Sequence, residues 1–276
     1  SVEWRVINAA DYGRAQRRRR VFFFVFRNDT KWGKRLHTKY EATLPTDADL
    51  DTRLACYTPY IFKDGLFARQ FPVKGEAVKK RINANKLDED IAEVSANFSD
   101  GKMWNSGLMT NGYYYTIETE PKGDEEPIPM KKIVVKENQV PEDYYVDGEK
   151  LEKFKYLRGP KKITRTAANG HTYTFSEGGM SEYDSLELPG RTMLTSEGSV
   201  NRSTHLLKID GKYRLITPIE AERLQDFPDD WTRYKRNAKG EVVEVSDRMR
   251  MFFMGNALVT GIVKRIGDEL QKIDAI

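Results

Sequence analysis

The sequence has few of the residues that most often build disulfide-linked or metal-held sites. Cys56 is the single cysteine among 276 residues, which excludes an intrachain disulfide and a zinc site made of cysteines. The three histidines, His37, His171 and His205, are far apart and lack the spacing of metal ligands. We therefore expect no metal site.

Long apolar runs and targeting segments are also missing. No apolar stretch approaches the roughly 20 residues that span a bilayer, and no signal-peptide pattern opens the chain. We therefore expect a soluble, cytoplasmic protein. The chain begins at Ser1, at the edge of an expected strand and without an initiator methionine.

An excess of charge of one sign is missing as well. Lys and Arg number 46 against 42 Asp and Glu, so the formal net charge of +4 does not by itself demand a nucleic-acid partner. The basic residues nevertheless cluster in 14–20, 79–81 and 153–165, the last of which contains Lys161 and Lys162. Phosphate binding needs such local clusters more than net charge, although a charge run is often only a solvated face.

The first two dozen residues carry the most informative pattern. Strands are expected at 4–10 and 21–26, joined by a turn and an arginine run. Every residue of the second strand is apolar, which predicts burial on both faces inside a sheet that two strands cannot supply. If the run is extended, Gln16, Arg18 and Arg20 share one face at the edge of that sheet.

The middle of the chain has a different character. It predicts a separate, largely β and irregular domain with one helical segment at 87–98. Its β-like runs lie at 57–62, 113–118, 132–136 and 173–175.

The last part of the chain predicts two helices. Residues 217–220 form a capping box with proline at the first helical position, which predicts a helix from Pro218 to about Gln225. After a turn at Gly255-Asn256, apolar residues at helical spacing between 259 and 273 predict a final helix with one buried face.

Three motifs in this order resemble those of the DNA cytosine-5 methyltransferases. The segment 8–13, followed by Gln16-x-Arg18-x-Arg20, is similar to the eighth conserved motif of that family. Residues 214–229 are similar to the ninth motif, and residues 255–259 to the tenth. Each match alone is weak, but three ordered matches form a specific signal for the restriction-modification type of bacteria and phages.

The resemblance implies roles for the motif residues in attack on a flipped-out cytosine. Arg20 would lie at the cytosine O2, where a fixed cation stabilises the charge that develops on the ring. Arg18 would contact the phosphate backbone or brace the pocket, and Gln16 would position the segment. The tenth motif would border S-adenosylmethionine through Asn256, Ala257 and Leu258, although an ordinary helix-capping turn is the competing interpretation.

The polar stretch 191–205 is similar to the family's segment at the end of the target-recognition domain. Hydroxyl, amide and guanidinium groups suit contacts to phosphates and base edges, but a surface loop explains them equally well. The candidate DNA-binding residues are Arg191, Thr195, Ser196, Asn201, Arg202, Lys161 and Lys162.

Parts of the family's active site are missing from this sequence. The family nucleophile lies in a Pro-Cys pair, whereas Cys56 lies between Ala55 and Tyr57. The Phe-x-Gly-x-Gly cofactor loop and the Glu-Asn-Val acid motif are missing too. We therefore expect that the chain alone transfers no methyl group and needs an N-terminal catalytic half, in the same chain or in a separate subunit.

The expected fold is α/β: the C-terminal part of an S-adenosylmethionine-dependent methyltransferase fold, with an incomplete sheet and a large, mostly β and irregular target-recognition domain. The expected partner is duplex DNA. The expected division is 1–28 for the end strands of the catalytic domain, 29–205 for recognition, 206–250 for the connection with the ninth-motif helix, and 251–276 for the helix that returns to the catalytic domain.

Two other functions remain open on the sequence. A non-catalytic DNA-binding module would keep recognition and have lost the chemistry. An RNA-binding β protein would stack bases on its tyrosines, although alternating tyrosines more often pack within a sheet. The tyrosines concerned are Tyr113, Tyr114, Tyr115, Tyr144 and Tyr145.

Overall fold

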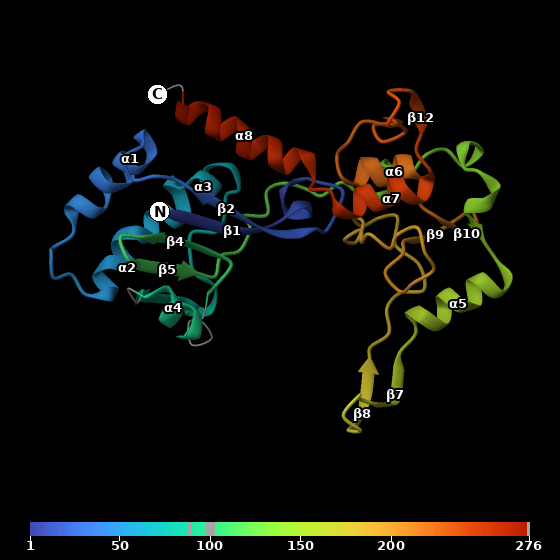
Figure 1. Ribbon diagram of the computed structural model, residues 1–276, viewed down its shortest axis with the longest axis horizontal. Helices are drawn as coiled ribbons and strands as arrows, with labels where there is room; N and C mark the ends of the chain where they lie inside the picture. The colour runs from blue at the N-terminus through green and yellow to red at the C-terminus, as the bar shows by residue number, and fades with distance from the viewer. Residues whose placement is uncertain (88–89, 98–102, 275–276) are drawn as a thin grey trace. The chain divides into compact units, whose positions relative to one another are not determined.

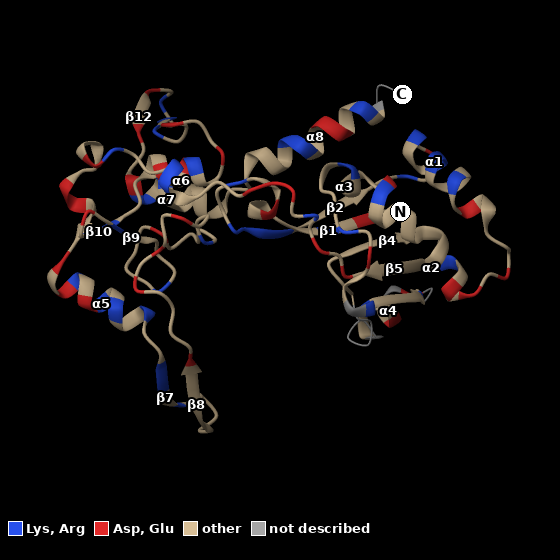
Figure 2. Cartoon of the chain, turned by 180° about the vertical axis from the view of Figure 1, so that it is seen from behind, with Lys and Arg blue, Asp and Glu red and all other residues tan. Residues whose placement is uncertain are grey.

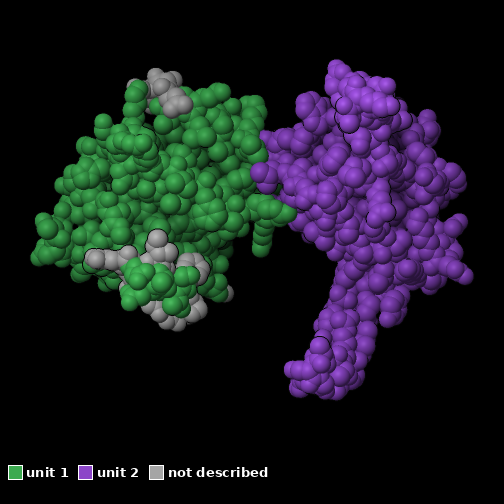
Figure 3. Space-filling model, viewed as in Figure 1, with its two compact units in different colours: residues 1–12, 19–126, 262–276 green, residues 13–18, 127–261 purple. Residues whose placement is uncertain are grey.

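The computed structural model describes residues 1–87, 90–97 and 103–274, and the chain divides into two compact units (Figures 1 and 3). Unit 1 comprises residues 1–12, 19–126 and 262–276, and unit 2 comprises residues 13–18 and 127–261. The arginine run is therefore split, with Arg18 in unit 2 and Arg19 and Arg20 in unit 1.

Unit 1 is built on an antiparallel sheet. Among the described residues, five strands follow the order β2-β1-β4-β5-β3. They are β1 (Val2–Asn8), β2 (Arg19–Val25), β3 (Ile82–Lys86), β4 (Ser106–Thr110) and β5 (Tyr113–Ile117). The predicted strands near 4–10, 21–26 and 113–118 are confirmed with shifted ends. The expected domain boundary after residue 28 does not separate this sheet from the middle of the chain. β1 pairs with β4, which lies well beyond that boundary.

One face of the sheet packs against helical segments of unit 1. Glu3 of β1 is 2 % exposed, and its carboxylate accepts hydrogen bonds of 2.9 Å from the N–H groups of Leu66 and Phe67. These two N–H groups begin α3, where backbone donors have no partner within the helix. The helices are α1 (Lys31–Lys39), α2 (Leu50–Pro59), a π-helical turn (Tyr60–Asp64), α3 (Leu66–Gln70), α4 (Ile91–Asn97) and α8 (Thr260–Asp274).

The β-like run predicted at 57–62 is wrong, because these residues lie in α2 and the π-helical turn. Tyr57, Tyr60 and Ile61 are each at most 3 % exposed, and their spacing of three and four residues places them on one helical face. The short apolar run was ambiguous between strand and helix, and helical packing against the sheet decided it. The predicted helical segment at 87–98 contains α4, and its residues 88, 89 and 98 lie outside the described residues.

The other face of β2 is exposed. Phe22 and Phe24 pack near Phe67 and Trp32, at ring-centroid distances of 6.5 and 5.8 Å. Phe23 and Val25 instead keep exposed fractions of 64 and 70 %, and Val21 is 47 % exposed. β2 is an edge strand, and its second face is exposed within the described chain. Burial of that face by a larger sheet outside this chain stays a prediction.

Unit 2 combines small antiparallel sheets with three helices, as seen among its described residues. Its strands are β6 (Tyr145–Val146), β7 (Lys161–Thr166), β8 (Thr172–Glu177), β9 (Leu206–Ile209), β10 (Lys212–Leu215), β11 (Tyr234–Arg236) and β12 (Val242–Glu244). Its helices are α5 (Gly148–Arg158), α6 (Pro218–Leu224) and α7 (Asp247–Asn256). Met193, Leu224 and Met254 lie in its hydrophobic core. The predicted run at 173–175 falls in β8, whereas the one at 132–136 is wrong, because no strand is assigned there among the described residues.

The capping box at α6 is confirmed. The Thr217 hydroxyl accepts a hydrogen bond from the Glu220 N–H at 3.3 Å, and the Glu220 carboxylate accepts one from the Thr217 N–H at 2.7 Å. Glu220 is fully buried and also accepts from Arg214 Nη2 at 2.8 Å and from the N–H of Val135 at 2.9 Å. The same carboxylate thus begins the helix and ties it to two other segments.

The predicted turn at Gly255-Asn256 is wrong, because both residues are the last of α7. A Cβ on Gly255 would lie 2.5 Å from the backbone of Leu194 and Thr195, so glycine permits close backbone approach here. The final helix, α8, is confirmed, and its predicted apolar stripe is buried in part: Ile262 is 2 % exposed, whereas Val263 and Leu270 are 42 and 37 % exposed. None of the described helices is long and apolar enough to cross a membrane.

Candidate functional site

Gln16 joins two distant segments inside unit 2. Its side chain is fully buried. Nε2 donates to the Leu224 carbonyl at 3.2 Å, and Oε1 accepts from the Met193 N–H at 3.2 Å. Because both bonds are buried, loss of the amide would leave backbone groups unpaired. Gln16 therefore fixes the start of the arginine run to the end of α6.

Arg18 extends the same connection to α7. Its side chain is 3 % exposed and donates to the Met193 carbonyl at 2.8 Å and to the Gly255 carbonyl at 3.0 Å. Gln16 and Arg18 together place the segments around residues 16–18, 193, 224 and 255 side by side. Residues 13–18 of the segment similar to the eighth motif thus meet the segments similar to the ninth and tenth motifs in unit 2.

Arg20 lies on β2 in unit 1, opposite Ile7 of β1. Its side chain is half-buried, while its neighbour Arg19 is exposed. Arg20 Nη1 donates to the Arg19 carbonyl at 2.7 Å. Over the part of the chain that the structure describes, no carboxylate forms an ion pair with this guanidinium. Its positive charge is therefore not neutralised within the described chain.

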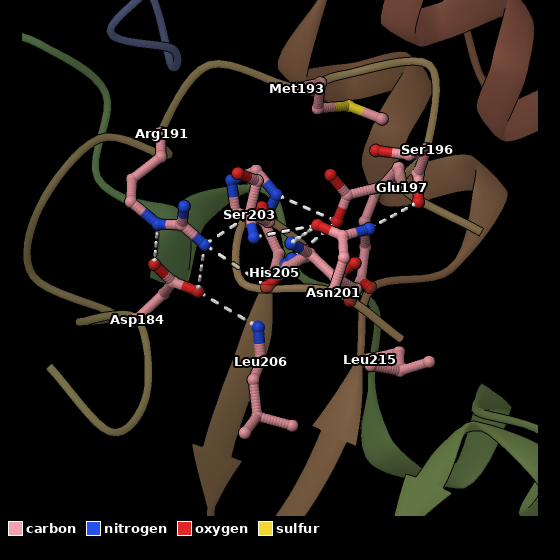
Figure 4. A network of polar contacts seen from close by, with 12 residues as sticks. Asp184, Arg191, Met193, Ser196, Glu197, Asn201, Ser203, His205, Leu206 and Leu215 are labelled. Atoms are coloured by element: carbon pink, nitrogen blue, oxygen red, sulfur yellow. Dashed lines mark hydrogen bonds and ion pairs between the residues drawn. The ribbon is translucent and has the colours of Figure 1, made fainter. Parts of the chain in front are cut away.

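The polar stretch 191–205 forms an internal network in unit 2 (Figure 4). Arg191 pairs with Asp184 and donates to the Ser203 carbonyl at 3.1 Å. Asn201 donates to the Ser196 carbonyl at 2.9 Å and accepts from the Ser203 N–H at 2.8 Å. Arg191 and Asn201 thus shape the loop, whereas Thr195 and Ser196 are exposed on it.

The basic candidates near β7 also divide. Lys161 and Arg202 both pair with Glu177, at 3.3 and 2.9 Å, and so hold the base of the β7–β8 hairpin. Lys162 is exposed, and no hydrogen bond or ion pair holds its side chain within the described chain. Lys162 is therefore available to a partner, while the other two are structural.

The sequence matches the family pattern described as C-5 cytosine-specific DNA methylase over residues 1–272. The chain belongs to that family. It is 49 % identical over 276 residues to the Type II methyltransferase M.Sau3AI of Staphylococcus aureus. The match covers all of this chain and 60 % of that relative.

The residues that the resemblance assigns to the methylase cofactor lie at the end of α7. Asn256 is exposed, and its amide donates to the Phe252 carbonyl at 3.2 Å. Ala257 is half-buried, and Leu258 is 41 % exposed. These residues form an open surface, and they do not by themselves enclose a molecule the size of S-adenosylmethionine.

The sequence did not predict a buried ion-pair network around Asp184. Asp184 is 7 % exposed and contacts Arg158, which is 1 % exposed, at 2.8 Å. Burial raises the pKa of Asp184, but the Arg191 hydrogen bond and the nearby His205, Arg191 and Arg158 charges outweigh it and hold the pKa well below its usual range. A lone aspartate in a polar loop offered no sequence signal of these partners.

His205 and Glu197 form a second buried pair that the sequence reasoning did not single out. Nδ1 of the imidazole lies 3.0 Å from Glu197 Oε1, which also accepts from the His205 N–H at 2.5 Å. Both side chains are at most 3 % exposed. Among the described residues, no group of three or more His, Cys, Asp or Glu side chains is placed to hold a metal ion.

Proposed function

We propose that this chain is the C-terminal portion of a DNA cytosine-5 methyltransferase. It would bind duplex DNA at a specific site and methylate a flipped-out cytosine at C5, with S-adenosylmethionine as the methyl donor. The observation that carries the proposal is the buried connection of Gln16 and Arg18 to Leu224, Met193 and Gly255. It joins residues 16–18 of the first motif-like segment to the other two motif-like segments.

The roles proposed for the arginines follow from their surroundings. Arg18 braces the motif segments, because two carbonyls occupy its guanidinium. Arg20 is half-buried and not neutralised by a carboxylate within the described chain, as a cation directed at the cytosine O2 would need to be. Asn256, Ala257 and Leu258 would border S-adenosylmethionine on one side only, because they do not enclose it by themselves.

The nucleophile is proposed to come from outside this chain. Cys56 lies in α2 and donates through Sγ to the Tyr40 carbonyl at 3.4 Å, so its thiol is part of helix packing. The sequence lacks the Pro-Cys pair, and the chain spans 60 % of the relative that it matches. These facts support a separate or preceding catalytic half.

The exposed face of β2 is the proposed contact for that half. Val21, Phe23 and Val25 point to one side of an edge strand, and Val6 of β1, which is 38 % exposed, lies opposite Val21. An apolar, unpaired edge favours association with another strand or layer. The catalytic half would cover this face.

Complementation tests the proposed function. The purified 276-residue chain is expected to transfer no labelled methyl group from S-adenosylmethionine to duplex DNA. Co-expression with the part of M.Sau3AI that this chain does not match is expected to produce C5-methylated cytosine. Methyl transfer by the chain alone would contradict the proposal. Site-specific DNA binding without methyl transfer in either sample would favour the non-catalytic DNA-binding module instead.

Replacing Phe23 with serine is expected to reduce complementation at least about tenfold, because a phenylalanine buried at an interface contributes about 1.5–3 kcal/mol. The free energy of unfolding of the chain itself should change by less than about 1 kcal/mol, since Phe23 is 64 % exposed. Methyl transfer against the concentration of the catalytic half measures the first effect, and urea unfolding measures the second. Trp231→Ser, at 65 % exposure in unit 2, is the matched control and should complement normally. If both variants lost complementation equally, the exposed face of β2 would not be the contact for the catalytic half.

A further inference from the structure

The β7–β8 hairpin of unit 2 projects from the body of its unit (Figure 1). Lys161–Thr166 pairs with Thr172–Glu177 in an antiparallel register. Six residues per strand give a ribbon about 20 Å long. A two-stranded ribbon on its own is marginally stable in water. A projecting ribbon is therefore better explained by a function than by its contribution to folding.

The base of the hairpin is fixed to its unit. Glu177 pairs with Lys161 at 3.3 Å and with Arg202 at 2.9 Å. Arg202 also donates to the Leu157 carbonyl at 3.1 Å, and Lys161 donates to the same carbonyl at 2.6 Å. The ribbon is therefore held at its base by two other segments of unit 2, the end of α5 and the loop that contains Arg202.

The two faces of the ribbon differ. One face carries Ile163 opposite Phe175 and Arg165 opposite Tyr173. The Arg165 guanidinium lies 3.9 Å from the centroid of the Phe175 ring, so side chains of this face contact one another through a cation–π interaction. It is the face that stabilises the ribbon.

The opposite face consists of hydroxyls and a cation. Thr164 pairs with Thr174, Thr166 with Thr172, and Lys162 with Ser176. All six side chains are exposed, and within the described chain no hydrogen bond or ion pair involves their side-chain polar groups. We call these six residues the hydroxyl face.

The charge of the ribbon has one sign beyond its base. Residues 162–176 contain Lys162, Arg165 and His171 and no Asp or Glu (Figure 2). A balanced chain of 46 basic and 42 acidic residues thus presents a segment of fifteen residues free of acid. The positive charge of this segment is complementary to the negative charge of a nucleic-acid backbone.

We propose that the β7–β8 ribbon enters the major groove of duplex DNA with its hydroxyl face toward the base edges. The major groove of undistorted B-DNA, about 12 Å wide, admits a two-stranded ribbon, whereas proteins that enter the minor groove, about 6 Å wide, frequently unstack and kink the duplex. Threonine hydroxyls contact base edges and their methyl groups contact thymine methyls, while Lys162 contacts phosphate. This inference rests on the proposed function and assigns it a specificity element.

Selection from randomised duplex DNA tests the ribbon, using the wild-type complemented enzyme and the double variant Thr164→Val and Thr174→Val. Valine keeps the shape and the strand preference of threonine and removes only the hydroxyl. The ratio of affinities for the selected site and for random duplex is expected to fall at least about fivefold, the low end for one lost base contact. Tyr173→Phe, which removes a hydroxyl from the other face of the same ribbon, should leave the ratio unchanged.

Lys162→Ala provides a second readout. It should weaken binding to all duplexes about equally and reduce the slope of log affinity against log salt concentration by about 1. If the wild type methylates and selects a site while the double variant selects it equally well, the ribbon proposal is overturned and the proposed function stands. If the wild type neither methylates DNA nor selects a sequence, both proposals are overturned.

Discussion

Replacing Asp184 with asparagine is expected to lower the free energy of unfolding of unit 2 by about 3 kcal/mol. The substitution leaves the guanidinium of Arg158 buried beside a neutral amide, and removing one partner of a buried pair is among the costliest single changes. Arg191 loses the same carboxylate. Urea unfolding followed by circular dichroism measures the change, and hydrogen exchange of peptides from 127–261 assigns it to unit 2.

The same substitution should change how stability depends on pH. The pKa of Asp184 is lowered in the folded protein, so its carboxylate contributes fully at neutral pH. That contribution declines only as the pH falls below the ordinary aspartate value of 3.8 toward the lower folded pKa. The difference between wild type and Asp184→Asn should therefore narrow in acid. A difference that stayed constant from pH 7 to pH 3 would contradict the assignment.

Asp229→Asn is the matched control for this prediction. Asp229 pairs with Arg223 at 2.6 Å, but the two side chains are 48 and 32 % exposed. Solvent screens such a pair, so its loss should cost less than about 1 kcal/mol. Comparable losses for the two aspartates would show that burial does not set the strength of the Asp184 network.

Replacing Arg20 with lysine is expected to reduce the methyl-transfer rate of the complemented enzyme about 100-fold or more. Removing a preorganised charge-stabilising donor has effects of that size, and lysine cannot reproduce the rigid guanidinium fork. Affinity for duplex DNA should change by much less, because the proposed interaction strengthens only as the ring gains charge. Single-turnover methylation and equilibrium DNA binding separate the two effects.

Arg19→Lys is the control for Arg20. The two residues are adjacent on β2, carry the same charge and differ in burial, with Arg19 exposed and Arg20 half-buried. The Arg19 variant should keep its methyl-transfer rate within about threefold, as surface changes usually do. Equal loss of rate in both variants would show that Arg20 is not distinguished from its exposed neighbour, and an unchanged rate in both would show that positive charge alone suffices. Either outcome would contradict the proposed role of Arg20 at the cytosine O2.

Elements with local signals could be predicted from the sequence. The capping box begins α6 at Pro218 because the Thr217 hydroxyl and the Glu220 carboxylate are three residues apart, which is a local relation. The strand character of residues 21–26 is local too, because it rests on a run of aromatic and β-branched residues. Whether the second face of β2 is buried is not, because Val21, Phe23 and Val25 look the same in a central strand and in an edge strand.

The candidate site divides in the same way. The order of three motifs indicated that Gln16, Arg18 and Gly255 matter. It did not indicate that Gly255 serves close backbone approach to Leu194, or that its carbonyl accepts from Arg18. Those contacts join residues up to 237 positions apart, and spacing along the chain carries no information about such distances.

By itself, the sequence determined the family resemblance, the capped helix, the two N-terminal strands and the lack of a Pro-Cys nucleophile. Those features depend on residue types at short separations. Only the tertiary structure decided which polar side chains are bound by hydrogen bonds or ion pairs within the protein and which are available to a partner. Arg191, Asn201 and Arg202 are bound within unit 2, whereas Lys162 is free among the described residues. The reason is physical: a buried guanidinium or amide needs partners to offset the loss of water, and folding alone brings them within reach.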